Sequence, residues 1–337
     1  KHSYSAYLKE GEMMSSMPQH ITSWHPDRPV SKGATAYHDA VVDSSWLKDI
    51  LFELSKIVKP SIKDNDVIVD FGAGTGTSAL HLMKNLDKKV KLWLVDNSPS
   101  WLAKAYELLN GVADARYFVL EKKEDRYATL AETIGENIAD HVISANTVHL
   151  IPDIEETFKG ISLALKKHGT FTFQTGNFLR KNRPEGALMI DDTVQTVHDI
   201  AINIIKKDSR YKSYRHQLDE KISSMASQRK LVFRDPRPIE FYLNSLQSSG
   251  FKASEPQFIP VRIKYDDWLN FLRVKRLQAG ILQEFGGKEP TPEEEKVRDN
   301  LITQGALQLF DDLRKNNPQA DNECFLKECV YVLSKKE

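Results

Sequence analysis

A glycine-rich turn follows a short apolar run near residue 70. The run Val67–Asp70 leads through Phe71 into Gly72-Ala73-Gly74-Thr75-Gly76, and a helical pattern begins at Thr77. A turn of this kind, between a buried strand and a helix, lets the backbone approach a ligand closely and directs free N–H groups at it. These residues therefore predict a binding site for a nucleotide-like cofactor.

The spacing of the glycines excludes two common kinds of cofactor site. A dinucleotide fingerprint that starts at Gly72 and Gly74 would place its third glycine at position 77, but the sequence has Thr77 there and Gly76 before it. A phosphate-binding P-loop would need Gly-Lys followed by Ser or Thr at the end of the turn, and that sequence is absent.

A carboxylate lies at the end of the next apolar run. The residues Leu92–Val95 lead into Asp96, which is followed by Asn97 and Ser98. The interval after the glycine turn is about 20 residues, as in related dinucleotide folds, where an acidic residue at this place binds the ribose hydroxyls. Two motifs in register are a stronger indication than one.

Alternating strands and helices must hold these residues in place. The pattern is typical of βαβ units and predicts an α/β fold with a doubly wound, mostly parallel sheet. We expect strands at 66–71, 91–96, 115–120, 141–145 and 170–175, and helices at 44–59, 77–85, 100–109, 127–134 and 154–166. Beyond these, we expect helices at 238–249, 266–285 and from Pro292 toward Leu313, an extended stretch at 251–264, and a strand at 324–334.

The glycine turn and its register with Asp96 resemble motif I and the second strand of the class I S-adenosylmethionine (SAM)-dependent methyltransferases, of the type that acts on small molecules. The segment Val142–Asp153 resembles the fourth-strand region of that family, and Lys166–Phe173 resembles its fifth strand, with His168 and Thr170 departing from the usual Lys-Pro-Gly-Gly turn. The resemblance implies a Rossmann-like sheet of seven strands, with 324–334 as an antiparallel edge strand.

The resemblance also implies roles for individual residues. SAM is the expected cofactor, with the glycine loop and its preceding acid at the methionine end, Asp96 at the ribose, and the residues after the fourth strand beside the methyl group. The expected cofactor-binding residues are Asp70, Gly72, Ala73, Gly74, Gly76, Asp96, Asn97, Ser98, Asn146 and Thr147. The segment 121–125 lacks the family's usual acidic-small pair, which leaves the residue that contacts adenine open.

The rest of the chain divides around this core. We expect residues 1–43 to form an N-terminal arm, 44–176 the SAM-binding core, 177–237 a helical insertion, and 238–337 the remainder of the sheet with a further helical insertion at about 266–320. In related small-molecule methyltransferases an arm and an insertion after the fifth strand build the substrate pocket. By analogy, these segments form a lid, and deleting residues 1–30 should abolish turnover while leaving the fold intact.

Composition narrows the class of partner. Lys plus Arg and Asp plus Glu both number 47, so no net positive charge attracts nucleic acid. No apolar run approaches the length of a membrane span, and no apolar signal core is visible, so the cytoplasm is the default expectation. His20, His25 and His38 have no familiar zinc spacing, so we expect no metal. A small-molecule substrate is favoured, and the oligomeric state stays open.

His149 is the candidate for chemistry beyond alignment of the reactants. It follows the fourth strand closely, and an imidazole with an ordinary pKa of about 6.5 could accept a proton or orient the substrate. A packed loop histidine is the competing interpretation. A protein that binds SAM or S-adenosylhomocysteine without catalysis, acting as a regulatory or interaction module, is the alternative function. Methyl transfer from a sulfonium needs a base only for a protonated nucleophile. The absence of a sharply defined base in the sequence is therefore compatible with O, N, S and C nucleophiles, and the nature of the nucleophile stays open.

Overall fold

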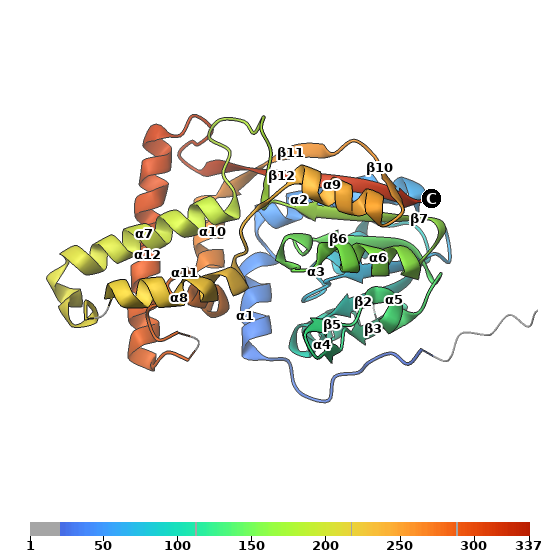
Figure 1. Cartoon of the computed structure of the whole chain (residues 1–337), viewed down its shortest axis with the longest axis horizontal. Helices are drawn as coiled ribbons and strands as arrows, with labels where there is room; N and C mark the ends of the chain where they lie inside the picture. Colours follow the sequence, from blue (N-terminus) through green and yellow to red (C-terminus); the bar gives the residue numbers. More distant parts are fainter. Residues whose placement is uncertain (1–20, 112, 217, 288) are drawn as a thin grey trace, which may run out of the picture.

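The computed structural model describes residues 21–111, 113–216, 218–287 and 289–337 (Figure 1). Its main sheet runs in the order β10-β12-β7-β6-β1-β2-β3, and β11 adds an eighth strand along β12. The strands of this sheet are β1 (Val67–Phe71), β2 (Lys91–Asp96), β3 (Ala115–Val119), β6 (Ala139–Ala145), β7 (Leu165–Thr175), β10 (Phe251–Ala253), β11 (Gln257–Lys264) and β12 (Cys324–Lys336). Short pairs join β4 (Lys122–Lys123) to β5 (Arg126–Tyr127) and β8 (Phe178–Leu179) to β9 (Arg237–Pro238).

Helices cover both faces of the sheet because successive strand side chains point to opposite faces. On β1, Ile68 packs into one hydrophobic cluster while Val67 and Val69 pack into the other. The first cluster includes α2 (Ser45–Val58), α3 (Thr77–Asn85) and α4 (Pro99–Leu109). The second includes α5 (Leu130–Ile134), α6 (Ile154–Ala164) and α9 (Ile239–Ser248).

A helical body lies beside the sheet half of the molecule (Figure 1). In it, α7 packs on α12 and α8 packs on α11, although these helices come from two separate stretches of sequence. Its members are α7 (Ile190–Lys207), α8 (Leu218–Val232), α10 (Tyr265–Leu272), α11 (Lys275–Ile281) and α12 (Pro292–Asn316). Helix α1 (Lys32–Val41) lies between this body and the sheet, in contact with both α10 and α4. Three short 3₁₀ helices lie at Lys59–Ser61, Val148–Leu150 and Ser209–Tyr214.

The doubly wound, mostly parallel α/β fold expected from the sequence is confirmed. The expectation that 324–334 forms an edge strand is wrong. Although β12 is antiparallel, it pairs with β7 on one side and with β10 and β11 on the other. The extended stretch 251–264 divides into these two strands, both of which pair with β12 and cover its edge.

Two helix predictions also need correction. The helix expected at 127–134 begins only at Leu130, because the Thr129 side chain caps it in a reciprocal capping box with Glu132. The helix expected at 266–285 is broken between Leu272 and Lys275. The Gln278 side chain donates to the Arg273 carbonyl, and the Arg273 guanidinium binds Asp299 of α12, so tertiary contacts end α10 there.

Candidate active site

A cavity of about 800 Å³ lies at the carboxyl ends of β1, β2 and β6. Ligands of open α/β sheets bind in this place, where the strand order reverses. One part of the lining comes from the glycine turn and the end of β2, and another from α1, α2, α10 and the end of α8. The predicted residues that line it are Gly72, Ala73, Gly74, Asp96, Asn97, Ser98, Asn146, Thr147 and His149.

The glycine turn holds a left-handed backbone beside the cavity, and the N–H groups of Gly72 and Ala73 donate to the Val95 carbonyl at the end of β2. Gly72 has φ 73° and Gly74 has φ 54°. A Cβ added to Gly72 would lie 2.2 Å from Thr147 Cγ2, so the backbone there has room for no side chain. The Thr147 hydroxyl donates to the Gly72 carbonyl at 3.1 Å and to the Ala145 carbonyl at 3.0 Å, which ties the turn to the end of β6.

Asp96 fixes the other side of the turn. Its Oδ2 accepts from Gly74 N–H at 2.8 Å, and its Oδ1 accepts from Ser98 N–H at 2.8 Å. Burial raises the pKa of this carboxyl, while the backbone N–H groups and the Arg276 charge act in the opposite direction. Each oxygen keeps acceptor capacity for a further donor, such as a ribose hydroxyl.

Asp70 and Gly76 lie behind the turn and do not line the cavity. Asp70 is fully buried, and its Oδ2 accepts from the Ser78 hydroxyl at 2.5 Å. Burial raises the pKa of Asp70 to about 7, partly offset by the bond from Ser78. Ser78 does line the cavity, so Asp70 is linked to the cavity wall through this hydroxyl. A Cβ on Gly76 would meet Ala105 at 2.8 Å, so this glycine serves the packing of α3 on α4.

The turn after β6 places Asn146 and Thr147 opposite Gly72. Asn146 has φ 53°, and its backbone N–H donates to both the carbonyl and the side-chain oxygen of Gln174. The Oδ1 of Asn146 is buried without a partner among the described residues. It is an acceptor available to a bound molecule, because buried polar atoms are normally paired.

His149 lines the cavity but is not an ordinary histidine. It is 8% exposed, and its Nδ1 lies 3.0 Å from the Thr175 hydroxyl. Burial, followed by the charges of Lys327 and Arg237, lowers its pKa to about 3. The expectation of an ordinary pKa near 6.5 is therefore wrong, because the surroundings disfavour the imidazolium. At neutral pH the ring is neutral and a weak base.

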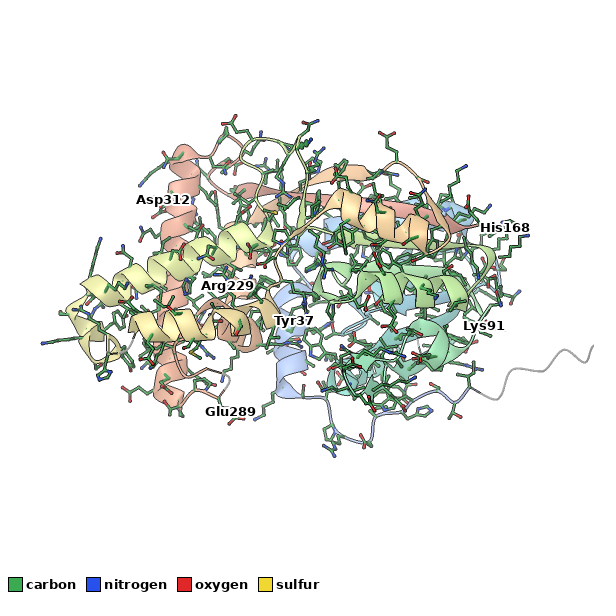
Figure 2. The ribbon with its side chains drawn as sticks, viewed as in Figure 1. Tyr37, Lys91, His168, Arg229, Glu289 and Asp312 are labelled. Atoms are coloured by element: carbon green, nitrogen blue, oxygen red, sulfur yellow. The ribbon has the colours of Figure 1, made fainter. Side chains whose placement is uncertain are left out.

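The structure brings three further residues to the cofactor end of the cavity. Tyr37 of α1 packs on Trp101 of α4 with ring centroids 4.5 Å apart, and the Arg276 guanidinium lies 4.8 Å from the Trp101 ring. All three line the cavity beside Asp96. Figure 2 labels Tyr37 where α1 meets the sheet half of the molecule. Trp101 follows Asp96 closely in the sequence, and this closeness was the one sequence signal that it lies near the cofactor. Tyr37 and Arg276 come from distant segments.

The next strand contributes to the same end of the cavity. Leu120, directly after β3, lines it, as do Asp125, Arg126 and Tyr127, whereas residues 121–124 do not. The part of the predicted 121–125 segment that can contact a ligand is therefore its last residue.

The far end of the cavity is aromatic. Trp46 of α2 and Trp268 and Phe271 of α10 line it, and each pair of these rings lies within 5.8 Å. Residues 231–234, at and just beyond the end of α8, line it as well. The insertion after the fifth strand therefore contributes part of the wall.

The histidines of the N-terminal segment do not gather. His20 lies outside the described residues. His25 packs on Tyr106, and His38 approaches the Thr75 and Thr77 hydroxyls at 3.4 Å. Within the described ranges, no three His, Cys, Asp or Glu side chains are placed to hold a metal ion.

In the same ranges, no helix is both long and apolar enough to cross a bilayer.

The residues present fit the SAM that the sequence resemblance implies. The glycine turn packs against Thr147 and leaves no room for a side chain at Gly72. Asp96 lies beside the turn with two carboxylate oxygens. The Asn146 Oδ1, which has no partner among the described residues, is an acceptor on the opposite side. The cavity lies in the upper part of the ~300–1,000 Å³ range of ligand pockets, which suits a cofactor together with a second small molecule.

Comparisons with known proteins identify the family. The model of a family described as a methyltransferase domain matches residues 62–234, which is just over half of the chain. A search of curated protein sequences gave no match.

Solved structures to which the chain is similar include the YcgJ protein from Bacillus subtilis, with 15% identity and a TM-score of 0.47, covering 86% of this chain and 98% of that one. Another is phosphoethanolamine N-methyltransferase 2 from Haemonchus contortus in complex with phosphomonomethylethanolamine and S-adenosylhomocysteine. It has 16% identity and a TM-score of 0.48, covering 90% of this chain and 57% of that one. At these identities and scores, their ligands say nothing about the substrate of this chain.

Proposed function

Because this chain belongs to the methyltransferase domain family, we propose that it transfers a methyl group from SAM to a small molecule bound in the same cavity. The observation that carries the proposal is the continuity of that cavity. The glycine turn and Asp96 line one end, the aromatic group of Trp46, Trp268 and Phe271 lines the other, and His149 and Asn146 also line it. A site with both ends in one enclosure can bring two molecules into contact.

The residues of this chain then act mainly by holding and aligning. Asp96 would accept the ribose hydroxyls, and the turn Gly72–Gly74 would receive the methionine end. Bound SAM supplies a methyl group already activated by its sulfonium. Alignment of nucleophile, methyl and sulfur can account for as much as ~7–11 kcal/mol of the barrier, and a base is needed in addition only where the nucleophile carries a proton. The neutral His149 ring would orient the acceptor.

Replacing His149 with alanine should therefore have a modest effect. Loss of a neutral hydrogen bond costs about 0.5–1.5 kcal/mol, so the single-turnover rate of methyl transfer should fall by roughly 2–12-fold. The shape of the pH–rate profile between pH 5 and 8 should be the same in both proteins, because the pKa of about 3 leaves His149 neutral throughout. A fall of ~10²–10⁴-fold with loss of an ionisation from the profile would instead establish His149 as the base.

The part of the N-terminal arm that covers the site should be α1. Ser31, whose side chain caps α1, and the whole helix lie beyond residue 30, so the loss of turnover expected from deleting 1–30 is reassigned to a longer deletion. A chain lacking residues 1–43 loses Tyr37 and His38 and should lose methyl transfer by roughly 10²-fold or more, since water then reaches the reacting groups. A chain lacking 1–30 is the matched control and should keep most of its activity. Equal rates for both chains would reassign α1 to packing.

The proposed function is tested by binding and transfer in sequence. Calorimetry with SAM and with S-adenosylhomocysteine should show saturable binding to the full chain. The protein with methyl-labelled SAM and a fractionated small-molecule extract should then yield a labelled small molecule and S-adenosylhomocysteine in equal amounts. Binding without labelled product would favour the non-catalytic module, and absence of binding would reject both functions.

A further inference from the structure

Lys327 is a buried cation at the aromatic end of the cavity. It lies on β12, is 1% exposed, and lines the cavity. Its side chain passes directly over Gly176, where an added Cβ would lie 2.3 Å from Lys327 Cε and 2.6 Å from Nζ. Its Nζ makes no hydrogen bond within the described part of the chain. A buried ammonium that uses none of its three donors is costly.

Trp46, which lines the same cavity, carries a second unused donor. Trp46 Nε1 is buried and has no partner among the described residues. Lys327 Nζ lies 5.9 Å from the centroid of the Trp46 ring and 5.7 Å from that of Trp268. Ring faces at this distance favour the charged ammonium but accept no conventional hydrogen bond. Burial lowers the pKa of Lys327, and an anion beside it would restore the charged form.

Neither Glu328 nor Asp191 is hydrogen-bonded to Lys327. Glu328, the next residue on β12, makes a two-pronged ion pair with Arg180. Asp191, which lines the cavity, lies 3.8 Å from the Arg229 guanidinium. Lys327 Nζ and Trp46 Nε1 therefore both lack a partner among the described residues, and a molecule that enters the cavity could supply one.

We propose that the aromatic end of the cavity binds an apolar small molecule through a carboxylate, which accepts from Lys327 Nζ and Trp46 Nε1. One cation with one indole N–H suits a single carboxylate, whereas phosphate is usually met by several charged or backbone donors. The aromatic walls take the apolar remainder of the molecule. An ion pair with Lys327 makes the carboxylate a poorer nucleophile, so it serves as the anchor and the methyl group goes to another atom. This inference names a substrate class and rests on the proposed function.

Calorimetry on protein saturated with S-adenosylhomocysteine tests the inference. The probes are 3-phenylpropionate and octanoate, each compared with its uncharged amide, 3-phenylpropanamide or octanamide. We expect at least one acid to bind about tenfold or more tightly than its amide, the scale of a charge-assisted hydrogen bond. Equal binding of acid and amide in both pairs, or binding of neither acid, would overturn the inference.

Three variants identify which residues are responsible for the preference for the acid over the amide. Lys327→Met keeps the length of the side chain without its charge and should abolish the preference for the acid. Lys335→Met makes the same change at an exposed position of β12 and should preserve it. Trp46→Phe keeps a ring but removes the N–H and should reduce the preference. A preference that survives in Lys327→Met would contradict the inference.

Thermal unfolding and S-adenosylhomocysteine binding distinguish failure of this inference from failure of the proposed function. Lys327→Met should unfold at the same temperature as the parent or higher, because the ammonium has no partner in the cofactor-free protein; failure to fold would show a structural role and overturn the inference. Failure of S-adenosylhomocysteine to bind the parent would reject the proposed function. Its binding without any acid preference would reject only the carboxylate assignment.

Discussion

Replacing Asp96 with alanine is expected to weaken SAM binding by about 1.5–3 kcal/mol, the scale of a hydrogen bond to a charged group. This corresponds to a loss of roughly tenfold to more than a hundredfold in affinity. The carboxylate is expected to accept the ribose hydroxyls, and it also holds Gly74 N–H and Ser98 N–H at 2.8 Å. Its removal therefore takes away a ligand contact and loosens the turn that faces the methionine end. Calorimetric titration with SAM measures the effect.

Two further variants serve as controls for the Asp96→Ala result. Asp96→Asn keeps one acceptor oxygen but sets an amide N–H₂ group against a backbone donor, so its affinity should fall between those of the parent and Asp96→Ala. Asp114→Ala removes an exposed carboxylate at the opposite end of the same strands and should leave SAM affinity unchanged. Parent-like affinity in a folded Asp96→Ala protein would reject Asp96 as the ribose ligand.

Replacing Gly72 with alanine is expected to reduce both stability and SAM binding. A left-handed conformation costs an alanine about 1–2 kcal/mol, and the new Cβ would lie 2.2 Å from Thr147 Cγ2, which adds about 1–3 kcal/mol of overpacking. Thr147 must move, and its hydroxyl then loses the Gly72 carbonyl. The sum is roughly 2–5 kcal/mol in the free energy of unfolding, measured by denaturant titration.

Gly111 supplies a matched control for the backbone part of this effect. Its φ of 77° is close to the 73° of Gly72, yet an added Cβ would meet nothing within 4 Å. Gly111→Ala should therefore cost only about 1–2 kcal/mol and leave SAM affinity intact. Adding Thr147→Ala to Gly72→Ala removes the two nearest clashing atoms and should recover part of the stability. If Gly72→Ala were no more destabilising than Gly111→Ala, the close contact with Thr147 would carry no energetic weight.

The succession of strands and helices along the chain and the cofactor end of the site were accessible from the sequence because they depend on neighbouring residues. The turn at Gly72 and Gly74 needs its backbone conformation from adjacent residues, and Asp96 is placed by the length of one βα unit. The apolar runs of β1 and β2 are continuous because parallel strands are buried on both faces. Each of these signals is contained within a few tens of residues.

The electrostatic state of the site depended on tertiary structure. His149 was correctly expected near the cavity, but its pKa is set by burial and by the charges of Lys327 and Arg237, which come from distant segments. Asp70 lies in the expected motif, yet only the packing of α3 puts Ser78 between it and the cavity. Sequence spacing gives positions along the chain and does not give the local dielectric around a side chain.

The aromatic end of the cavity likewise came only from the fold. Trp46, Trp268 and Lys327 lie on α2, α10 and β12, and no sequence period relates them. A lysine inside the mostly buried strand Cys324–Lys336 was the one local signal, and by itself it does not reveal what the side chain faces. The sequence by itself determined the succession of strands and helices and the cofactor turn, because backbone conformation and hydrophobic pattern depend on neighbouring residues. The tertiary structure decided which distant side chains share one enclosure, because that follows from how helices and sheet pack over the whole chain.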